Sequence, residues 1–135
     1  MEKPKECIIV DGSCVKGGII EYRGFHYPSM NQLFSKGPFD GGTNNIAEFL
    51  GLVSGMMYSE KYNLFLPVYS DSNTALSWVR WGKHNSGLEK TEENEQIFRG
   101  LASAEKWLSK NKSEVVVEKW RTDLWGENPA DYDRK

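Results

Sequence analysis

The sequence has little cysteine and no long apolar run. Only two cysteines, Cys7 and Cys14, occur among 135 residues, too few for a disulfide-rich scaffold or a zinc cluster, so we expect both to be buried thiols. The longest apolar stretches, such as residues 64–69, are far shorter than the roughly 20 residues that cross a bilayer. The charged N-terminus, MEKPKE, has no apolar signal segment behind it. We therefore predict a soluble, cytoplasmic protein without a membrane partner.

The sequence also lacks a large excess of charge of one sign. It contains 17 Lys+Arg and 19 Asp+Glu, for a formal charge of −2, whereas a basic surface is usual for proteins that bind nucleic acid. Taken alone, this balance argues against a nucleic-acid partner. No repeat, low-complexity tract or linker interrupts the 135 residues, and this length is typical of one domain. We predict a single domain over residues 1–135.

Hydrophobic periodicity predicts five strands and three helices. The apolar runs typical of strands cover residues 7–10, 18–22, 25–34, 64–69 and 115–117. Apolar residues at helical spacing cover residues 46–57, 72–81 and 92–110, and a glycine-containing loop over 36–45 precedes the first of these helices. The order βββαβααβ begins with an antiparallel meander and continues with strands that alternate with helices. We predict an α/β fold with a five-stranded mixed sheet flanked by helices.

Four acids occupy related positions along this order. Asp11 closes the first predicted strand and Asp71 closes the fourth, so both carboxylates project from one end of the sheet if those strands are parallel neighbours. Glu48 lies in the first turn of the first predicted helix, which must begin near the same end. Asp131 follows the last strand and its loop. The four acids can therefore converge in one cleft.

Clustered carboxylates point to a metal site. Because like charges at short range repel, such a cluster needs a cation to neutralise it. Oxygen ligands without histidine or cysteine favour Mg²⁺ or Mn²⁺ over zinc, and four carboxylates can hold two ions ~3.5–4 Å apart, an arrangement suited to phosphodiester hydrolysis. Each acid also has a structural alternative, which for Asp131 is a place in a frayed tail. Asp11 could form a turn with Gly12, Glu48 a capping box with Asn45, and Asp71 a helix cap.

Four short segments form an ordered set. In chain order they are residues 11–13 (DGS), 43–48 (TNNIAE), 70–72 (SDS) and 127–131 (ENPAD). In this set and in the order of its elements, the sequence resembles the type 1 ribonucleases H over essentially its whole length, and TNNIAE is the most specific match. The resemblance implies a ribonuclease-H-like fold. It also implies Mg²⁺-dependent hydrolysis of the RNA strand of RNA–DNA hybrids, leaving 5′-phosphate and 3′-hydroxyl ends.

The resemblance assigns catalytic, metal-binding roles to the same four acids. Carried over position by position, they are Asp11, Glu48, Asp71 and Asp131. The implied cofactor is a pair of Mg²⁺ ions, with Mn²⁺ as the alternative. Since these acids account for four of the 19 in the chain, the mild acidity argues less strongly against a polyanionic partner. Only residues 132–135 follow Asp131, so we expect the family's last helix to be nearly absent, and Asp133 is the alternative fourth ligand.

The resemblance also assigns substrate contacts. Three asparagines match positions that face the minor groove of the hybrid, a threonine matches a contact to a DNA-strand phosphate, and two basic residues fall where some relatives have a basic protrusion. These residues are Thr43, Asn44, Asn45, Asn73, Arg80 and Lys83. The alternatives are helix-start positions for the asparagines and solvated charges for the basic pair. The implied partner is an RNA–DNA hybrid; no protein partner is implied, and we expect a monomer.

Two departures from the family keep other functions open. Many relatives carry a histidine in the loop before the last acid, but residues 122–129 contain none and Trp125 stands there instead. The turn over residues 14–18 lacks the family's Asn-Pro-Gly. One alternative function is a non-catalytic hybrid-binding module of the same fold. Another is a DNA nuclease or resolvase-like relative.

Overall fold

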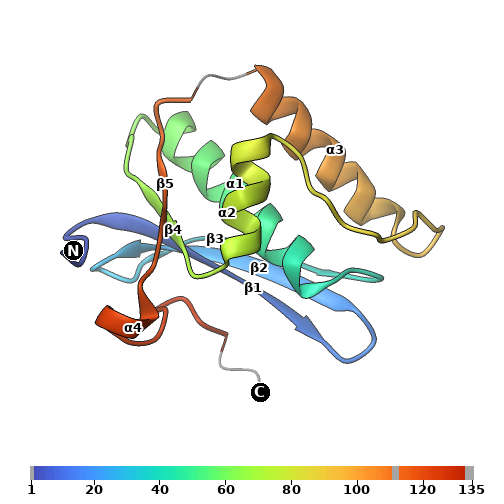
Figure 1. Ribbon diagram of the computed structural model, residues 1–135, viewed down its shortest axis with the longest axis horizontal. Helices are drawn as coiled ribbons and strands as arrows, with labels where there is room; N and C mark the ends of the chain where they lie inside the picture. Colours follow the sequence, from blue (N-terminus) through green and yellow to red (C-terminus); the bar gives the residue numbers. More distant parts are fainter. Residues whose placement is uncertain (1, 111–112, 133–135) are drawn as a thin grey trace.

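The computed structural model describes residues 2–110 and 113–132. Within them, a five-stranded sheet has the strand order β3-β2-β1-β4-β5 (Figure 1). The strands are β1 (Cys7–Val15), β2 (Ile19–Tyr27), β3 (Gln32–Phe39), β4 (Val68–Ser70) and β5 (Val117–Lys119). The first three form an antiparallel meander, whereas β4 lies parallel to β1 and β5 parallel to β4. The sheet is therefore mixed, as predicted from the sequence.

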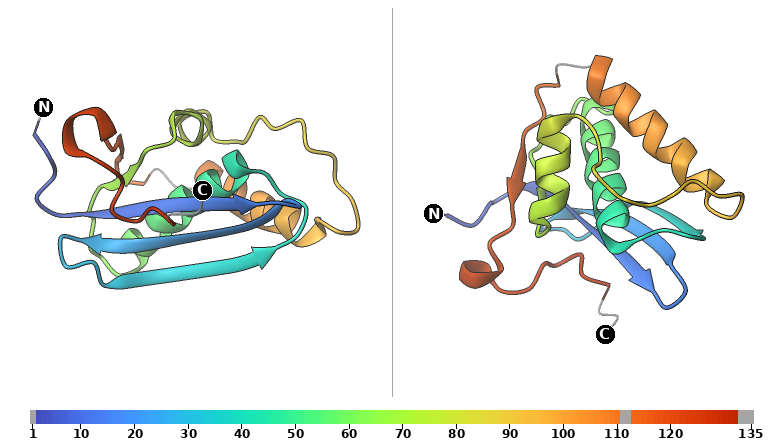
Figure 2. Two further views of the ribbon diagram at one scale, coloured as in Figure 1. Left: turned by 90° about the horizontal axis from the view of Figure 1, so that it is seen from below. Right: turned by 45° about the vertical axis from the view of Figure 1, so that its right-hand side comes forward.

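Helices lie on both sides of this sheet. The helices are α1 (Asn44–Lys61), α2 (Asn73–Trp81), α3 (Glu95–Lys110) and α4 (Thr122–Trp125). The three long helices lie on one side of the sheet, and the short α4 and the segment after it lie on the other, as two views show (Figures 1 and 2). No helix among the described residues combines the length and the apolar character needed to cross a membrane.

Apolar clusters cover both faces of the sheet at β1, so this strand is buried on both faces. Ile8 and Val10 pack with the long helices, whereas Ile9 packs with Trp120 and Ala130 on the opposite face. This double burial explains why the first seven residues of β1 are all buried, as strands covered on both faces usually are. Cys7 is fully buried, as predicted, and burial raises the pKa of its thiol to about 12. Cys14 is only half-buried, so that part of the prediction is wrong.

The order of the elements agrees with the prediction, but several boundaries differ. The predicted strand over 25–34 instead spans the end of β2, a turn and the start of β3. β3 continues to Phe39 inside the predicted loop, because an edge strand tolerates glycine and proline at positions 37 and 38. β4 covers only residues 68–70 and β5 covers residues 117–119. The short helix α4 has no counterpart in the prediction.

Candidate active site

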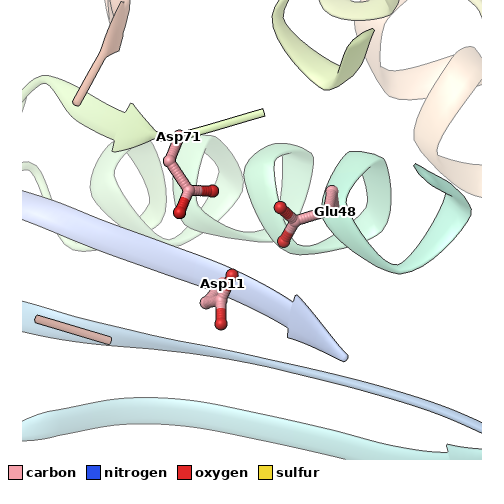
Figure 3. A group of neighbouring side chains, drawn as sticks. All are labelled: Asp11, Glu48 and Asp71. Carbon is pink, nitrogen blue, oxygen red and sulfur yellow. The ribbon is translucent and has the colours of Figure 1, made fainter. Parts of the chain in front are cut away.

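Three carboxylates from different elements face one another in one cleft. Asp11 comes from β1, Glu48 from α1 and Asp71 from the residue after β4, and the close-up shows the three side chains directed toward a common point (Figure 3). One carboxylate oxygen from each lies within 4.8 Å of the others. The surrounding cleft has a volume of about 300 Å³ and is lined by Asp11, Gly12, Ser13, Cys14, Asn44, Glu48, Asp71, Asp131 and Tyr132.

The register of two parallel strands brings Asp11 and Asp71 together. Ile9 of β1 pairs with Tyr69 of β4, so the residues two positions further along lie at the same level on neighbouring strands. Asp71 follows the last residue of β4, as the sequence indicates. Asp11, however, lies in the middle of β1 rather than at its end, because β1 continues through Gly12 and Ser13 to Val15. The predicted strand end at Asp11 and the alternative of a turn with Gly12 are therefore both wrong, although the predicted proximity of the two acids is correct.

Close packing of β1 against α1 places Glu48. A Cβ atom on Gly12 would lie 2.5 Å from the main-chain carbon of Ala47 and from the nitrogen of Glu48, so only glycine permits this approach. The Gly12 main-chain N–H donates a hydrogen bond to Oε1 of Glu48. Thr43 is the N-cap of α1, and its hydroxyl accepts from the Ile46 N–H at 3.3 Å. Glu48 therefore begins the second turn, and the predicted first-turn position and capping box with Asn45 are wrong.

Burial and mutual repulsion perturb the acids. Asp11 and Glu48 are each only 6% exposed. Burial, the neighbouring charges of Asp11 and Asp71, and a hydrogen bond to Asp11 raise the pKa of Glu48 to about 10. Burial is also the main cause that raises the pKa of Asp11, to about 6. In the metal-free protein at neutral pH, Glu48 therefore holds a proton and shares a hydrogen bond with Asp11.

Protein cations do not neutralise this cluster in the part of the chain that the structure describes. No salt bridge there involves Asp11, Glu48 or Asp71. Lys119 of β5 donates to the main-chain carbonyl of Asp71 and not to its carboxylate. The cluster thus has the oxygen donors and the uncompensated negative charge that a divalent cation requires.

Asp131 reaches the same cleft from an irregular segment. It lines the cleft but does not belong to the group of three close carboxylates. Its main-chain N–H donates to the Asn128 carbonyl at 3.0 Å, and the Tyr132 N–H next to it donates to Oδ2 of Asp11 at 3.1 Å. Asp133, the alternative fourth ligand, lies outside the described residues.

Three of the predicted substrate residues line two hollows near the start of α1. Asn44 is exposed and lines the acid cleft. Thr43 and Asn45 line a neighbouring hollow of about 410 Å³, whose other wall is Trp78 and residues 85–88. Asn73 is exposed as the first residue of α2, and Ser72 before it is the N-cap, so the predicted helix-start position is correct.

The two basic residues lie away from the acids. Arg80 is exposed near the end of α2 and lines a third hollow together with Trp81, which is 64% exposed. Lys83 is exposed just after α2 and lines neither the acid cleft nor the hollow beside Thr43. Trp78, one turn before Trp81, is only 6% exposed and packs against Phe49 in the core.

Neither histidine lies in the acid cleft. His26, in β2, contacts Ser29 at 2.6 Å and Glu6 at 2.7 Å. The His84 Nδ1 atom lies 2.5 Å from Oε2 of Glu105 on α3. Both histidines therefore make their side-chain contacts outside the acid cleft.

Two lining residues were not identified from the sequence. Ser86, in the loop after α2, lines the hollow beside Thr43. Tyr132, next to Asp131, lines the acid cleft. The only sequence signal for Ser86 is a short Asn-Ser-Gly stretch in a polar loop, which carries no periodicity. Tyr132 has only its place beside an assigned acid.

No family model matches the sequence, but solved structures have a similar fold. The N-terminal ribonuclease H domain of a Mycobacterium tuberculosis protein, solved as a fusion with maltose-binding protein, is 18% identical, with a TM-score of 0.53 over 84% of this chain and 86% of that one. Ribonuclease H1 of the halophilic archaeon Halobacterium salinarum is 14% identical, with a TM-score of 0.51 over 88% of this chain and 87% of that one.

A viral enzyme has the same likeness. The foamy viral protease–reverse transcriptase, solved in complex with an RNA/DNA hybrid, is 15% identical, with a TM-score of 0.54 over 96% of this chain and 20% of that one. At sequence identities this low, the structural similarity establishes the fold alone, and the chemistry must be argued from the residues of the site. With its mixed sheet in the order β3-β2-β1-β4-β5 and its helices on both sides, the chain has the ribonuclease H-like fold.

Proposed function

We propose that this protein is a ribonuclease H that hydrolyses the RNA strand of RNA–DNA hybrids with two Mg²⁺ ions, leaving 5′-phosphate and 3′-hydroxyl ends. The observation that carries the proposal is the group of three carboxylates, two buried and one half-buried, that lie within 4.8 Å of one another and that no protein cation pairs with in the described part of the chain. The fold adds support, because ribonucleases H from a bacterium and an archaeon share it.

The donor set fits a divalent cation. Asp11, Glu48 and Asp71 would hold the ions, and Asp131 would complete the set from the rim of the cleft. Only oxygen atoms are offered, which suits Mg²⁺ or Mn²⁺. Bound divalent ions would activate the attacking water and stabilise the charge that develops on the leaving oxygen. Because Glu48 holds a proton in the metal-free protein, loading the site would release protons.

The remaining groups orient the acids and the substrate. The hydrogen bond from the Gly12 N–H fixes the carboxyl group of Glu48 against β1. Asn44, at the edge of the acid cleft, and Asn45 and Asn73 nearby would contact the minor groove, where 2′-hydroxyl groups distinguish the RNA strand. No histidine lines the cleft among the described residues, so the leaving 3′-oxygen would take its proton from solvent.

The hollow beside Thr43 is suited to the DNA strand. Thr43, Asn45 and Ser86 place hydroxyl and amide groups around it, and such groups bind phosphate oxygens. Arg80 and Lys83 would add attraction for the same strand further along α2. The foamy viral protein of this fold was solved with a hybrid bound, which supports the choice of partner.

Cleavage of labelled duplexes tests the proposal. RNA–DNA hybrid, double-stranded DNA and double-stranded RNA are incubated with wild type and Asp71→Asn in Mg²⁺, and Asp123→Asn, an exposed acid on α4, is the matched control. We expect only the hybrid to be cut, and Asp71→Asn to lower the rate by about a hundredfold or more. Binding of hybrid without cleavage in Mg²⁺ or Mn²⁺ would indicate a binding module. Cleavage of DNA without preference for hybrid would indicate a resolvase-like nuclease.

A further inference from the structure

The segment that carries Asp131 is anchored by contacts from the sheet. After α4, residues 126–132 form neither helix nor strand. The side chain of Asn128 donates to the Val10 carbonyl of β1 at 3.0 Å and accepts from the Ala130 N–H at 2.8 Å. Ala130 is fully buried in the cluster on this face of the sheet. These contacts tie the segment to the sheet up to residue 130, and within the segment the Asp131 N–H donates to the Asn128 carbonyl.

Arg23 supplies the next anchor. In the antiparallel pair of β1 and β2, it lies directly opposite Asp11. Its Nε and Nη2 atoms donate to the Ala130 carbonyl at 3.2 and 3.1 Å, and Nη2 also donates to the Asp131 carbonyl at 2.9 Å. The guanidinium group therefore holds the carbonyls of the two peptide groups that flank the Cα atom of Asp131.

Aromatic rings fix the plane of this guanidinium group. Its carbon lies 4.1 Å from the ring centroid of Tyr132 and 5.1 Å from that of Phe25. Tyr132 is in turn tied to the acid cleft, because its N–H donates to Oδ2 of Asp11. Asp131 thus lies between Ala130, whose carbonyl accepts from Arg23, and Tyr132, whose N–H donates to Asp11. An arginine suits this role better than a lysine, because only the planar fork combines several directed hydrogen bonds with stacking.

We propose that Arg23 is a positioning residue that sets Asp131 at the rim of the acid cleft so that its carboxylate completes the metal site. The proposal rests on the proposed function, since it gives Asp131 the part of fourth ligand. It adds a residue from β2, a strand that contributes no carboxylate to the cluster. Arg23 acts through the main chain of residues 130 and 131 and touches neither metal nor substrate.

A double-mutant cycle on metal binding tests this role. Mn²⁺ binding is measured by calorimetry, without nucleic acid, for wild type, Arg23→Met, Asp131→Asn and the double variant. Groups that orient metal ligands are typically worth 10–100-fold in affinity, so we expect Arg23→Met to weaken binding by about tenfold. We expect no further loss when Arg23→Met is added to Asp131→Asn, because the carboxylate that Arg23 positions is then already gone.

Further variants separate positioning from folding. Arg23→Lys retains the charge and should recover part of the lost affinity, whereas Arg99→Met, an exposed arginine of α3 paired with Glu95, should bind like wild type. Equal losses from Arg23→Met in both backgrounds, or unchanged binding in the single variant, would overturn the proposal. If wild type binds Mn²⁺ but does not cut hybrid, only the proposed nuclease function fails. Absence of Mn²⁺ binding in wild type would overturn both.

Discussion

Regular secondary structure holds three of the four candidate ligands, whereas side-chain contacts to an irregular segment hold the fourth. Asp11 lies in the central strand, Glu48 in a helix that packs directly on that strand, and Asp71 one residue after a parallel neighbour. Asp131 lies in a segment whose hydrogen bonds come from Arg23 and Asn128. The first three acids, the core acids, come from or directly follow packed strands and a packed helix, although only Asp11 and Glu48 are buried and Asp71 is half-buried. The fourth lies in a segment that packs on the face of the sheet opposite the long helices.

This difference separates two kinds of constraint. Asp11 and Glu48 cannot move without disturbing the contact between β1 and α1, and the three core acids repel one another when no cation is present. Asp131 can shift with its segment at the expense of only a few hydrogen bonds, and such peripheral segments open more readily than core strands. We therefore expect changes around the core acids to alter both stability and chemistry. Changes around Asp131 should alter chemistry alone.

The largest effect is expected from Gly12→Ala. The added Cβ would lie 2.5 Å from main-chain atoms of Ala47 and Glu48, so β1 and α1 must separate. We expect the free energy of unfolding to fall by about 3 kcal/mol or more and cleavage to be lost. Urea denaturation checks the first and the hybrid assay the second. The control is Gly100→Ala in α3, where the nearest atoms of Leu50 are 3.8 Å away and alanine should stabilise the helix by up to about 1 kcal/mol. A Gly12→Ala protein as stable as wild type would contradict the close contact.

The next largest effect is expected from Glu48→Gln, which should raise stability and abolish cleavage. The pKa of Glu48 is raised from an ordinary value of 4.5 to about 10, so between these values the folded metal-free protein binds more protons than the unfolded chain. Its stability therefore falls as pH rises through this window. Glu48→Gln removes the titrating group, so we expect a flatter pH profile, higher stability than wild type at pH 8 and no cleavage. Thermal unfolding without metal, from pH 5 to 9, measures the profile.

Melting temperatures measured with added Mg²⁺ provide a second test of Glu48→Gln. Mg²⁺ should raise the melting temperature of wild type, because it binds the folded form and relieves the repulsion. It should have little effect on Glu48→Gln. A wild-type melting temperature that neither falls with pH nor rises with Mg²⁺ would contradict the view that the core acids are mutually destabilising.

The contrast between the two kinds of ligand also explains what the sequence could predict. The element order, and the convergence of Asp11 with Asp71, follow from hydrophobic periodicity and from the geometry of parallel strands. The sequence nevertheless predicts a strand end at Asp11, because Asp-Gly-Ser is typical of turns. The structure retains Gly12 within β1, since the backbone of α1 lies where a side chain would be. That contact links residues distant in sequence, so local sequence patterns cannot predict it.

The surroundings of Asp131 were less predictable. Nothing in the sequence around Arg23 indicates a partner more than 100 residues away, because a lone arginine in a strand is compatible with any exposed position. The hollow beside Thr43 likewise combines residues from α1, α2 and the loop after α2. Arg80 and Lys83 stand out in the sequence by their charge, but the structure places them away from the acids. Charge patterns reveal candidate contacts, whereas their positions depend on packing.

A smaller effect is expected from Asp131→Asn. Asparagine keeps the main-chain hydrogen bonds of residue 131, so the free energy of unfolding should stay within about 0.5 kcal/mol of wild type. Cleavage should fall by roughly 10–100-fold and recover in part at high Mg²⁺, because one ligand of the site has lost its charge. A Mg²⁺ titration of the cleavage rate measures this recovery. A loss as complete as that of Asp71→Asn, with no recovery, would show that the fourth acid is equivalent to the other three.

The smallest effect on cleavage is expected from Asn128→Ala, which loosens the segment without removing a carboxylate. The variant loses the hydrogen bonds to the Val10 carbonyl and from the Ala130 N–H, so the segment should open more often while β1 stays intact. Hydrogen exchange should accelerate at the amides of Ala130 and Tyr132 and stay unchanged in the middle of β1, with cleavage reduced about threefold. Asn94→Ala is the matched control, since Asn94 is equally buried and also joins two segments, but remote from residues 126–132. If exchange in β1 accelerates together with that of the segment, Asp131 is held by the same cooperative unit as the core acids, and the distinction between the two kinds of ligand disappears.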